Sequence, residues 1–152
     1  MRDLYEIELI KKLKYRYMRV LDLNQWDELA DCFTEDAGTD YDSGKYSFQG
    51  KKNIIDFLRQ FMDRPTQITR HNAHHPEIDV TSDTIATGTW YLQDMVIDLD
   101  ANTTLRGAGF YHDEYEKVDG QWKIKHTGYV RTYEEIEERS DKTKLTTNIF
   151  SK

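Results

Sequence analysis

The amino-acid sequence predicts an α+β protein: a curved antiparallel sheet forming a cone-shaped α+β barrel, closed by helices from the N-terminal part of the chain. Three observations support this fold class. Apolar residues recur at helical spacing before about residue 62, apolar and polar residues alternate over long stretches after residue 68, and glycines interrupt those stretches. Because glycines inside strands mark bends or bulges, the sheet is expected to curl around an inner pocket.

Three helices are predicted in the first part of the chain. The first covers residues 5–22, where spacings of three and four residues relate Ile7, Ile10, Leu13, Lys14, Tyr17, Val20 and Leu21. The second begins at Asn24, with Asp27 as a capping-box acid, and its apolar stripe is Trp26, Leu29, Ala30 and Phe33. Residues 34–38 break it. The third covers residues 51–62 and ends before Pro65.

The remaining elements are strands. Short strands are predicted at 39–41 and 45–48, around the turn at 42–44, and long strands at 69–80, 84–98, 104–118 and 121–133. The pair Asp119-Gly120 is a strong hairpin signal between the last two. Residues 134–139 are predicted to add a final helical turn. The chain is therefore expected to form a single domain over residues 1–139, followed by a polar tail at 140–152.

Composition excludes several classes of function. The chain has 152 residues, of which 12% are aromatic, so disorder is not expected. A net charge of −7 disfavours nucleic acid and anionic membranes as partners, and no apolar run is long enough to cross a bilayer. Cys32 is the single cysteine, and the N-terminal residues lack an apolar signal-peptide core. These features predict a soluble protein of the cytoplasm.

Asp22 and His71 are the first candidates for chemistry. Asp22 ends the first predicted helix among apolar neighbours, where a carboxylate needs a polar partner, and His71 opens the first long strand. A carboxylate bonded to one imidazole nitrogen fixes the tautomer, so the other nitrogen can act as a general base. The alternative is that Asp22 bonds only to nearby backbone at the helix end and that His71 lies on the surface.

Four tyrosines and one arginine are the next candidates. Tyr17 lies on the inward face of the first helix, whereas Tyr41, Tyr111 and Tyr129 lie in predicted strands. Phenol hydroxyls can stabilise an enolate oxygen, although tyrosine is also simply a favourable strand residue. Strand alternation places Arg131 with Tyr129, away from Trp122 and Ile124 and facing the interior, unless a bulge at Gly128 reverses the parity. An inward Arg131 can bind an oxyanion, and an outward one is ordinary surface charge.

No metal site is predicted. The cluster His71-x-x-His74-His75 has the right ligand type, but adjacent strand residues point to opposite faces, and no cysteine pair or zinc-binding helix motif accompanies it. The sequence also lacks a P-loop, a dinucleotide-binding glycine motif and a Gly-x-Ser-x-Gly elbow.

An ordered set of segments resembles a known family. The segments, spread between residues 10 and 133, are KYRYMRVLD (14–22), WDEL (26–29), HHPEI (74–78), ATGTWYL (86–92), GFY (109–111), YEKVDGQW (115–122) and TGYVR (127–131). The chain resembles the SnoaL-like branch of the nuclear-transport-factor-2-like superfamily. Its strongest resemblance there is to the bile acid 7-alpha-dehydratases, and scytalone dehydratases and hexachlorocyclohexane dehydrochlorinases are more distant.

The resemblance implies roles for individual residues. Its acid–base dyad falls on Asp22 and His71, the tyrosine that contacts the substrate oxygen on Tyr17, and further pocket residues on Tyr41 and Arg131. It also implies a cofactor-free enzyme, often a homotrimer, but it does not transfer a substrate, since one fold hosts many functions.

The resulting hypothesis is a dehydratase-type lyase for a hydroxylated, carbonyl-activated lipophilic small molecule, such as a sterol-like or polyketide-like ketone. The alternatives are an isomerase or polyketide cyclase with the same base, or a non-catalytic small-molecule-binding module.

Overall fold

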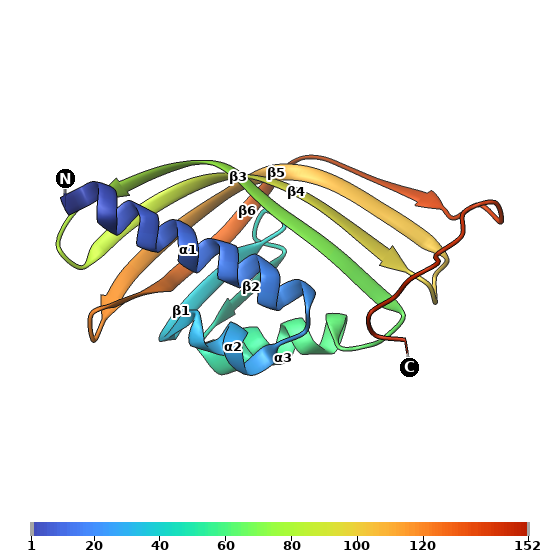
Figure 1. Ribbon diagram of the computed structural model, residues 1–152, viewed down its shortest axis with the longest axis horizontal. Helices are drawn as coiled ribbons and strands as arrows, with labels where there is room; N and C mark the ends of the chain where they lie inside the picture. Colours follow the sequence, from blue (N-terminus) through green and yellow to red (C-terminus); the bar gives the residue numbers. More distant parts are fainter. Residues whose placement is uncertain (1, 152) are drawn as a thin grey trace.

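A curved six-stranded sheet with helices on its concave face makes up a computed structural model that describes residues 2–151 (Figure 1). The predicted α+β cone is confirmed. The elements in chain order are α1 (Arg2–Asp22), α2 (Trp26–Asp31), β1 (Phe33–Tyr41), β2 (Tyr46–Gln49), α3 (Lys51–Met62), β3 (Gln67–Val80), β4 (Ile85–Asp98), β5 (Thr103–Val118) and β6 (Gln121–Glu138).

The sheet order is β2-β1-β6-β5-β4-β3. Every neighbouring pair is antiparallel except β1 and β6, which run parallel. The four long strands β3 to β6 form a continuous meander, and the short β1 and β2 extend it at one edge. This arrangement leaves a concave surface that α1 and α3 cover, with α1 packed against β3 and α3 against β1.

The core lies between the helices and the concave face. The inward face of α1 is apolar at the positions that helical spacing predicted, except at Lys14, and it packs on large side chains of β4 and β5. The buried apolar members include Ile10, Leu13, Tyr17, Val20, Leu21, Trp90, Leu92, Tyr111 and Tyr115. Each such side chain contributes about 1.5–3 kcal/mol when removed from water. This burial fixes α1 across the sheet and so determines where Asp22, its last residue, meets the strands.

Three local predictions were wrong, because the tertiary contacts of each segment outweighed a local signal. Residues 34–38 do not break a helix but form part of β1. This strand pairs with β6 at Phe33 and again from Gly38, with an irregularity between them, and it pairs with β2 from Gly38 onward. Residues 134–138 continue β6 opposite β5 instead of forming a helical turn. The capping box at Asn24 is absent: Gln25 precedes α2 without a side-chain cap, and the Asn24 amide instead donates to the Met62 carbonyl at 3.1 Å.

An irregularity in β6 decides which of its side chains face inward. The pairing with β5 passes from Tyr115–Ile124 to Glu114–His126, so Lys125 has no partner across the strand. Trp122 and Ile124 are buried before this point, and Thr127 is buried after it. The predicted single face from Trp122 to Val130 is therefore wrong, although Tyr129 and Arg131 do face inward, as expected.

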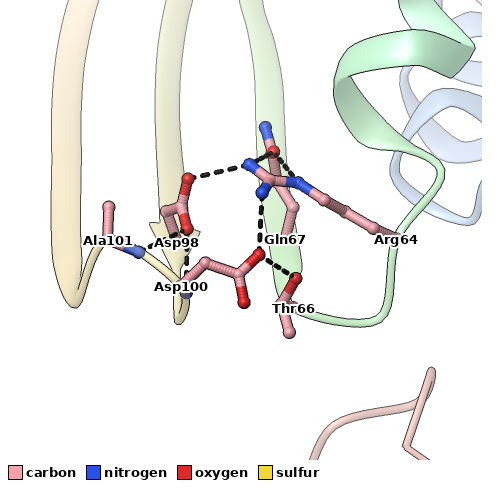
Figure 2. A network of polar contacts seen from close by, with 6 residues as sticks. All are labelled: Arg64, Thr66, Gln67, Asp98, Asp100 and Ala101. Carbon is pink, nitrogen blue, oxygen red and sulfur yellow. Dashed lines mark hydrogen bonds and ion pairs between the residues drawn. The ribbon is translucent and has the colours of Figure 1, made fainter.

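The turn between α3 and β3 is joined to the turn between β4 and β5 by a polar network (Figure 2). Arg64 donates to Asp98 and to Asp100, both at 2.8 Å, and Thr66 donates to Asp100 at 2.7 Å. The C-terminal segment after β6 folds back to the same region (Figure 1), where the Asn148 amide donates to the Pro65 carbonyl at 2.8 Å. None of the helices within residues 2–151 has the length and apolar character needed to span a membrane.

Candidate active site

A cavity of about 300 Å³ lies between α1, α3 and the concave face of the sheet. Six of the seven predicted site residues line it: Tyr17, Tyr41, His71, Tyr111, Tyr129 and Arg131. The seventh, Asp22, lies behind His71. Residues from one helix and four strands thus converge on a single space, because α1 crosses the sheet diagonally and presents its last two turns to β3.

The predicted contact between Asp22 and His71 is present. Asp22 Oδ1 lies 2.6 Å from His71 Nδ1, and its Oδ2 accepts the backbone N–H of His71 at 2.8 Å. Thr69, two residues earlier on the same face of β3, donates its hydroxyl to Asp22 Oδ1 at 2.8 Å. Since a carboxylate accepts hydrogen bonds, Nδ1 carries the proton in the neutral ring, and Nε2 retains a basic lone pair.

Two phenols meet at the cavity wall contributed by α1 and β1. The hydroxyls of Tyr17 and Tyr41 are 2.9 Å apart, so one donates to the other and a second proton remains for a ligand. Burial raises the pKa of both phenols above the usual value of 10.0, and it raises that of Tyr111 in the same way. Burial also raises the pKa of Tyr129 to about 12. All four side chains are therefore neutral hydrogen-bond donors at physiological pH.

Arg131 reaches the cavity as half of a buried ion pair. Its guanidinium bonds both carboxylate oxygens of Asp94, with Nη2 at 2.9 Å from Oδ2, and its Nε lies 3.3 Å from Glu134. Burial opposes the charge, but the bond to Asp94 prevails and raises the pKa of Arg131. A Cβ at Gly107 would overlap Arg131 Nη1, so any larger residue there would displace the guanidinium where it crosses β5. The charge of Arg131 is therefore compensated before any ligand binds.

A second ion pair, between Lys14 and Asp113, lies fully buried beneath the tyrosines. The two charged groups are 2.7 Å apart, and neither side chain is exposed. Tyr115 and Thr127 each donate a hydroxyl to Asp113 at 2.6 Å. The Lys14 ammonium lies 3.6 Å from the centre of the Tyr111 ring, a cation–π contact. Burial lowers the pKa of Lys14, whereas Asp113 opposes that change.

Sequence reasoning did not assign this second pair. The signal was present for Lys14, which occupies an inward position in the helical pattern of α1 beside apolar residues. A charged residue there needs a buried partner, but its identity depends on strand register. Asp113 shares a face with Tyr111 and Tyr115 in β5, and nothing local marks it as the partner.

The rest of the cavity wall is apolar with a polar rim. Apolar and aromatic members are Leu21, Tyr46, Phe57, Leu58, Phe61, Met62, Val96 and Leu105, and the other polar members are Asp42, Lys45, Gln67 and Glu134. An apolar wall with a few convergent polar groups is typical of a site for a small organic ligand.

A larger hollow, of about 810 Å³, lies on the opposite side of the sheet. Its lining includes Thr89, His112 and Glu114, which alternate in β4 and β5 with the buried Trp90 and Asp113. It contains neither His71 nor the Tyr17–Tyr41 pair, so size alone does not identify the site. No group of three or more His, Cys, Asp or Glu residues in the described part of the chain is placed to hold a metal ion.

Comparisons with known proteins agree with this fold. The profile of the SnoaL-like domain family matches residues 2–128. Among solved structures, a proposed scytalone dehydratase from Novosphingobium aromaticivorans is 24% identical, with a TM-score of 0.79 over 95% of this chain and 100% of that one. A type 2 hexachlorocyclohexane dehydrochlorinase is 19% identical, with a TM-score of 0.82 over 95% and 97%.

A third structural relative is a Mycobacterium tuberculosis protein of unknown function. It is 23% identical, with a TM-score of 0.73 over 86% of this chain and 73% of that one. At these identities the structural matches establish a shared fold and leave the reaction to the chemistry of the cavity.

Proposed function

This chain belongs to the SnoaL-like domain family, and from that premise we propose that it is a cofactor-independent lyase, a dehydratase acting on a small hydroxylated ketone. The observation that supports the proposal most strongly is the pairing of Asp22 with His71 at the wall of a cavity that also holds the Tyr17–Tyr41 hydroxyls. A tethered base and a phenol pair around one apolar space are what proton removal beside a carbonyl requires.

The proposed reaction is the loss of water from a β-hydroxyketone. His71 Nε2 takes a proton from the carbon next to the carbonyl, and the electron pair left behind gives an enolate. The enolate then collapses to the carbonyl, and its electron pair forms a carbon–carbon double bond as the β-carbon–oxygen bond breaks. The imidazolium then returns the proton to the departing hydroxide, so the only products are the unsaturated ketone and water. Asp22 orients the ring and stabilises its positive charge during the cycle.

The phenols are proposed to hold the carbonyl oxygen while it carries enolate charge. Tyr17 and Tyr41 already bond each other, so the free hydroxyl proton of the pair is aimed by its partner rather than rotating freely. A placed base contributes about 10²–10⁴ in rate, and one donor at the oxyanion about 10²–10³. Tyr111, Tyr129 and Arg131 are proposed to complete the substrate-binding wall.

A second candidate is an isomerase or cyclase that uses the same base. Proton removal beside a carbonyl is common to all three reactions, and the cavity geometry is compatible with each. Product mass separates them, because dehydration removes one water whereas isomerisation leaves the mass unchanged. A non-catalytic binding module would return every ligand unchanged, and it would have no use for a histidine tethered to a carboxylate.

The proposal is tested with 3-hydroxy-1-tetralone, a bicyclic β-hydroxyketone whose dehydration gives 1-naphthol, which is readily followed by fluorescence. We expect wild-type protein to form naphthol, His71→Ala to lower kcat by about 10²–10⁴-fold, and Asp22→Asn to lower it by about 10–10³-fold. His74→Ala is the matched control, since His74 lies on the same strand but outside the cavity. Near wild-type turnover by either dyad variant would refute the mechanism.

The oligomeric state and the cellular location of the protein are further predictions beside the proposed reaction. The homotrimer and the cytoplasmic location implied at the level of sequence stay predictions, and sedimentation of the purified protein measures the first. A species of one chain mass at micromolar concentration would reject the trimer without affecting the proposed chemistry.

A further inference from the structure

Gln67 occupies the end of the cavity remote from the phenol pair. It shares the inward face of β3 with Thr69 and His71, and it lines the same cavity as His71. Because a strand rises about 3.3 Å per residue, the Cα atoms of Gln67 and His71 lie about 13 Å apart. A ligand whose reacting carbon sits beside His71 therefore presents its other end to Gln67.

Arg64 fixes the orientation of the Gln67 amide. Its Nε and Nη2 both donate to Gln67 Oε1, at 2.9 and 2.5 Å. A guanidinium has only donors, so it selects the amide oxygen, and a flipped amide would direct its NH₂ group at the two N–H groups that now bond the oxygen. Figure 2 shows the Gln67 nitrogen on the side of the amide that points away from Arg64.

The guanidinium is itself held in place from the opposite side. Asp98 and Asp100 each accept one of its N–H groups at 2.8 Å. Backbone N–H groups of Asp100 and Ala101 bond Asp98 at 3.0 Å, and the Ala101 bond is the main cause of a lowered pKa for that carboxyl. Asp98 is therefore charged at neutral pH. A chain of contacts thus runs from the β4–β5 turn through Arg64 to the cavity wall.

The Gln67 nitrogen has two N–H donors and no acceptor among residues 2–151. Its oxygen is fully engaged by Arg64, so the amide cannot exchange its two ends without losing two hydrogen bonds. Two cations are among the described lining residues: Arg131 is already paired with Asp94, which lies opposite His71, and Lys45 is exposed on the β1–β2 turn. The free donor is therefore the group at this end that remains available to an incoming polar atom.

We infer that the Gln67 amide binds a second oxygen of the ligand, an acceptor such as a carbonyl or ether oxygen on an uncharged fused-ring compound, and that Arg64 is its positioning residue. A cavity of about 300 Å³ is at the lower limit for organic ligands and fits two fused rings rather than a four-ring skeleton. The charges of Arg131 and Lys14 are already compensated by Asp94 and Asp113, and Lys45, a further cation of the cavity lining, is exposed on the β1–β2 turn. This inference rests on the proposed use of the cavity, but its test measures binding rather than turnover.

The test compares the dissociation constant of 1-tetralone with those of its 5-, 6- and 7-methoxy derivatives, by calorimetry. None of these compounds has a β-hydroxyl, so none loses water, and a methoxy oxygen only accepts. We expect at least one isomer to bind wild-type protein about 3- to 10-fold more tightly than 1-tetralone. Gln67→Leu should remove that preference, and Gln67→Glu, which is isosteric but presents an acceptor, should reverse it.

Arg64 is tested by Arg64→Met against Arg59→Met. Arg59 is an exposed arginine of α3 that pairs with Asp63 and does not line the cavity, so its loss should leave the methoxy preference intact. Arg64→Met should reduce the preference, because the amide is then free to turn. A preference that survives Gln67→Leu, or the absence of any preference in wild-type protein, would overturn the inference.

The same ligands separate this inference from the proposed function. His71→Ala should keep the methoxy preference while losing turnover of 3-hydroxy-1-tetralone. A preference without turnover in wild-type protein contradicts the lyase proposal alone, and turnover without a preference contradicts the Gln67 assignment alone.

Discussion

The Asp22–His71 and Lys14–Asp113 pairs both join α1 to the sheet, yet they differ in what each leaves free. Asp113 accepts bonds from Lys14, Tyr115 and Thr127, and neither charged side chain is exposed. His71 bonds Asp22 through one nitrogen, and its side chain, which lines the cavity, is 15% exposed. A closed pair fixes structure, whereas a pair with one open nitrogen can exchange a proton with a ligand.

The largest effect on stability should come from removing one charge of the buried Lys14–Asp113 pair. We expect Lys14→Met to lower the free energy of unfolding by about 3–5 kcal/mol, because Asp113 is left buried without a counter-charge. The double variant Lys14→Met with Asp113→Leu should recover most of the loss, since it removes both charges. Urea unfolding measures both. Asp113→Leu alone completes the comparison. If the loss of free energy in the double variant equalled the sum of the losses in the two single variants, the two residues would not be energetically coupled.

A smaller effect is expected at the ion pair that faces the cavity. Arg131→Lys keeps the positive charge but loses the two-point bond to Asp94, and it should lower the free energy of unfolding by about 1–2 kcal/mol. Arg106→Lys is the control, because Arg106 bonds Glu137 on the exposed surface of the sheet. Equal losses of free energy of unfolding in the two variants would mean that burial of the Arg131–Asp94 pair adds nothing to stability.

The buried phenols should make the protein less stable at alkaline pH. The folded-state pKa values of Tyr17, Tyr41 and Tyr111 are raised, so their contribution to stability is present below pH 10 and is lost as pH rises beyond it. Each such group adds about 1.4 kcal/mol of loss per pH unit above its unfolded pKa. Tyr17→Phe should make the decline between pH 10 and 11 shallower by about that amount. If the free energy of unfolding of Tyr17→Phe declined with pH as steeply as that of wild-type protein, Tyr17 would be accessible to water in the folded protein.

The smallest stability effect is expected at the open pair. Asp22→Asn should lower the free energy of unfolding by only about 1 kcal/mol, since Asp22 is 21% exposed and its amide replacement still accepts one hydrogen bond. Its turnover should nevertheless fall well below that of wild-type protein. A stability loss comparable with that of Lys14→Met would instead place Asp22 among the structural charges.

The fold was predictable because its signals are periodic and local. Helical spacing located α1 and α3, alternation located the four long strands, and Asp119-Gly120 located the last hairpin. Strand β1 was shortened in the prediction because Glu35 and Asp36 lack strand preference, and these two residues lie in the irregular part of β1 between its pairings at Phe33 and Gly38. Residues 134–138 were misassigned for the same reason.

The site was predictable where one residue type stood out against its surroundings. Asp22 stood out among apolar residues and His71 opened a strand, and the tyrosines and Arg131 stood out by their faces in the predicted helix and strands. All were found before the family resemblance, which gave roles to Tyr17, Tyr41 and Arg131. Asp94, Asp113 and Gln67 were missed because their roles depend on cross-strand register and on the irregularity at Lys125, which no local pattern specifies.

Removal of a carbon-bound proton by His71 is the central step of the proposed reaction, and hydrogen exchange measures it without any need for elimination. The protein is incubated with 1-tetralone in D₂O at neutral pH, and deuterium entering the position next to the carbonyl is followed by NMR. Wild-type protein and His74→Ala should catalyse the exchange, and His71→Ala should slow it by about 10²-fold or more. Exchange at the wild-type rate in His71→Ala would contradict the account.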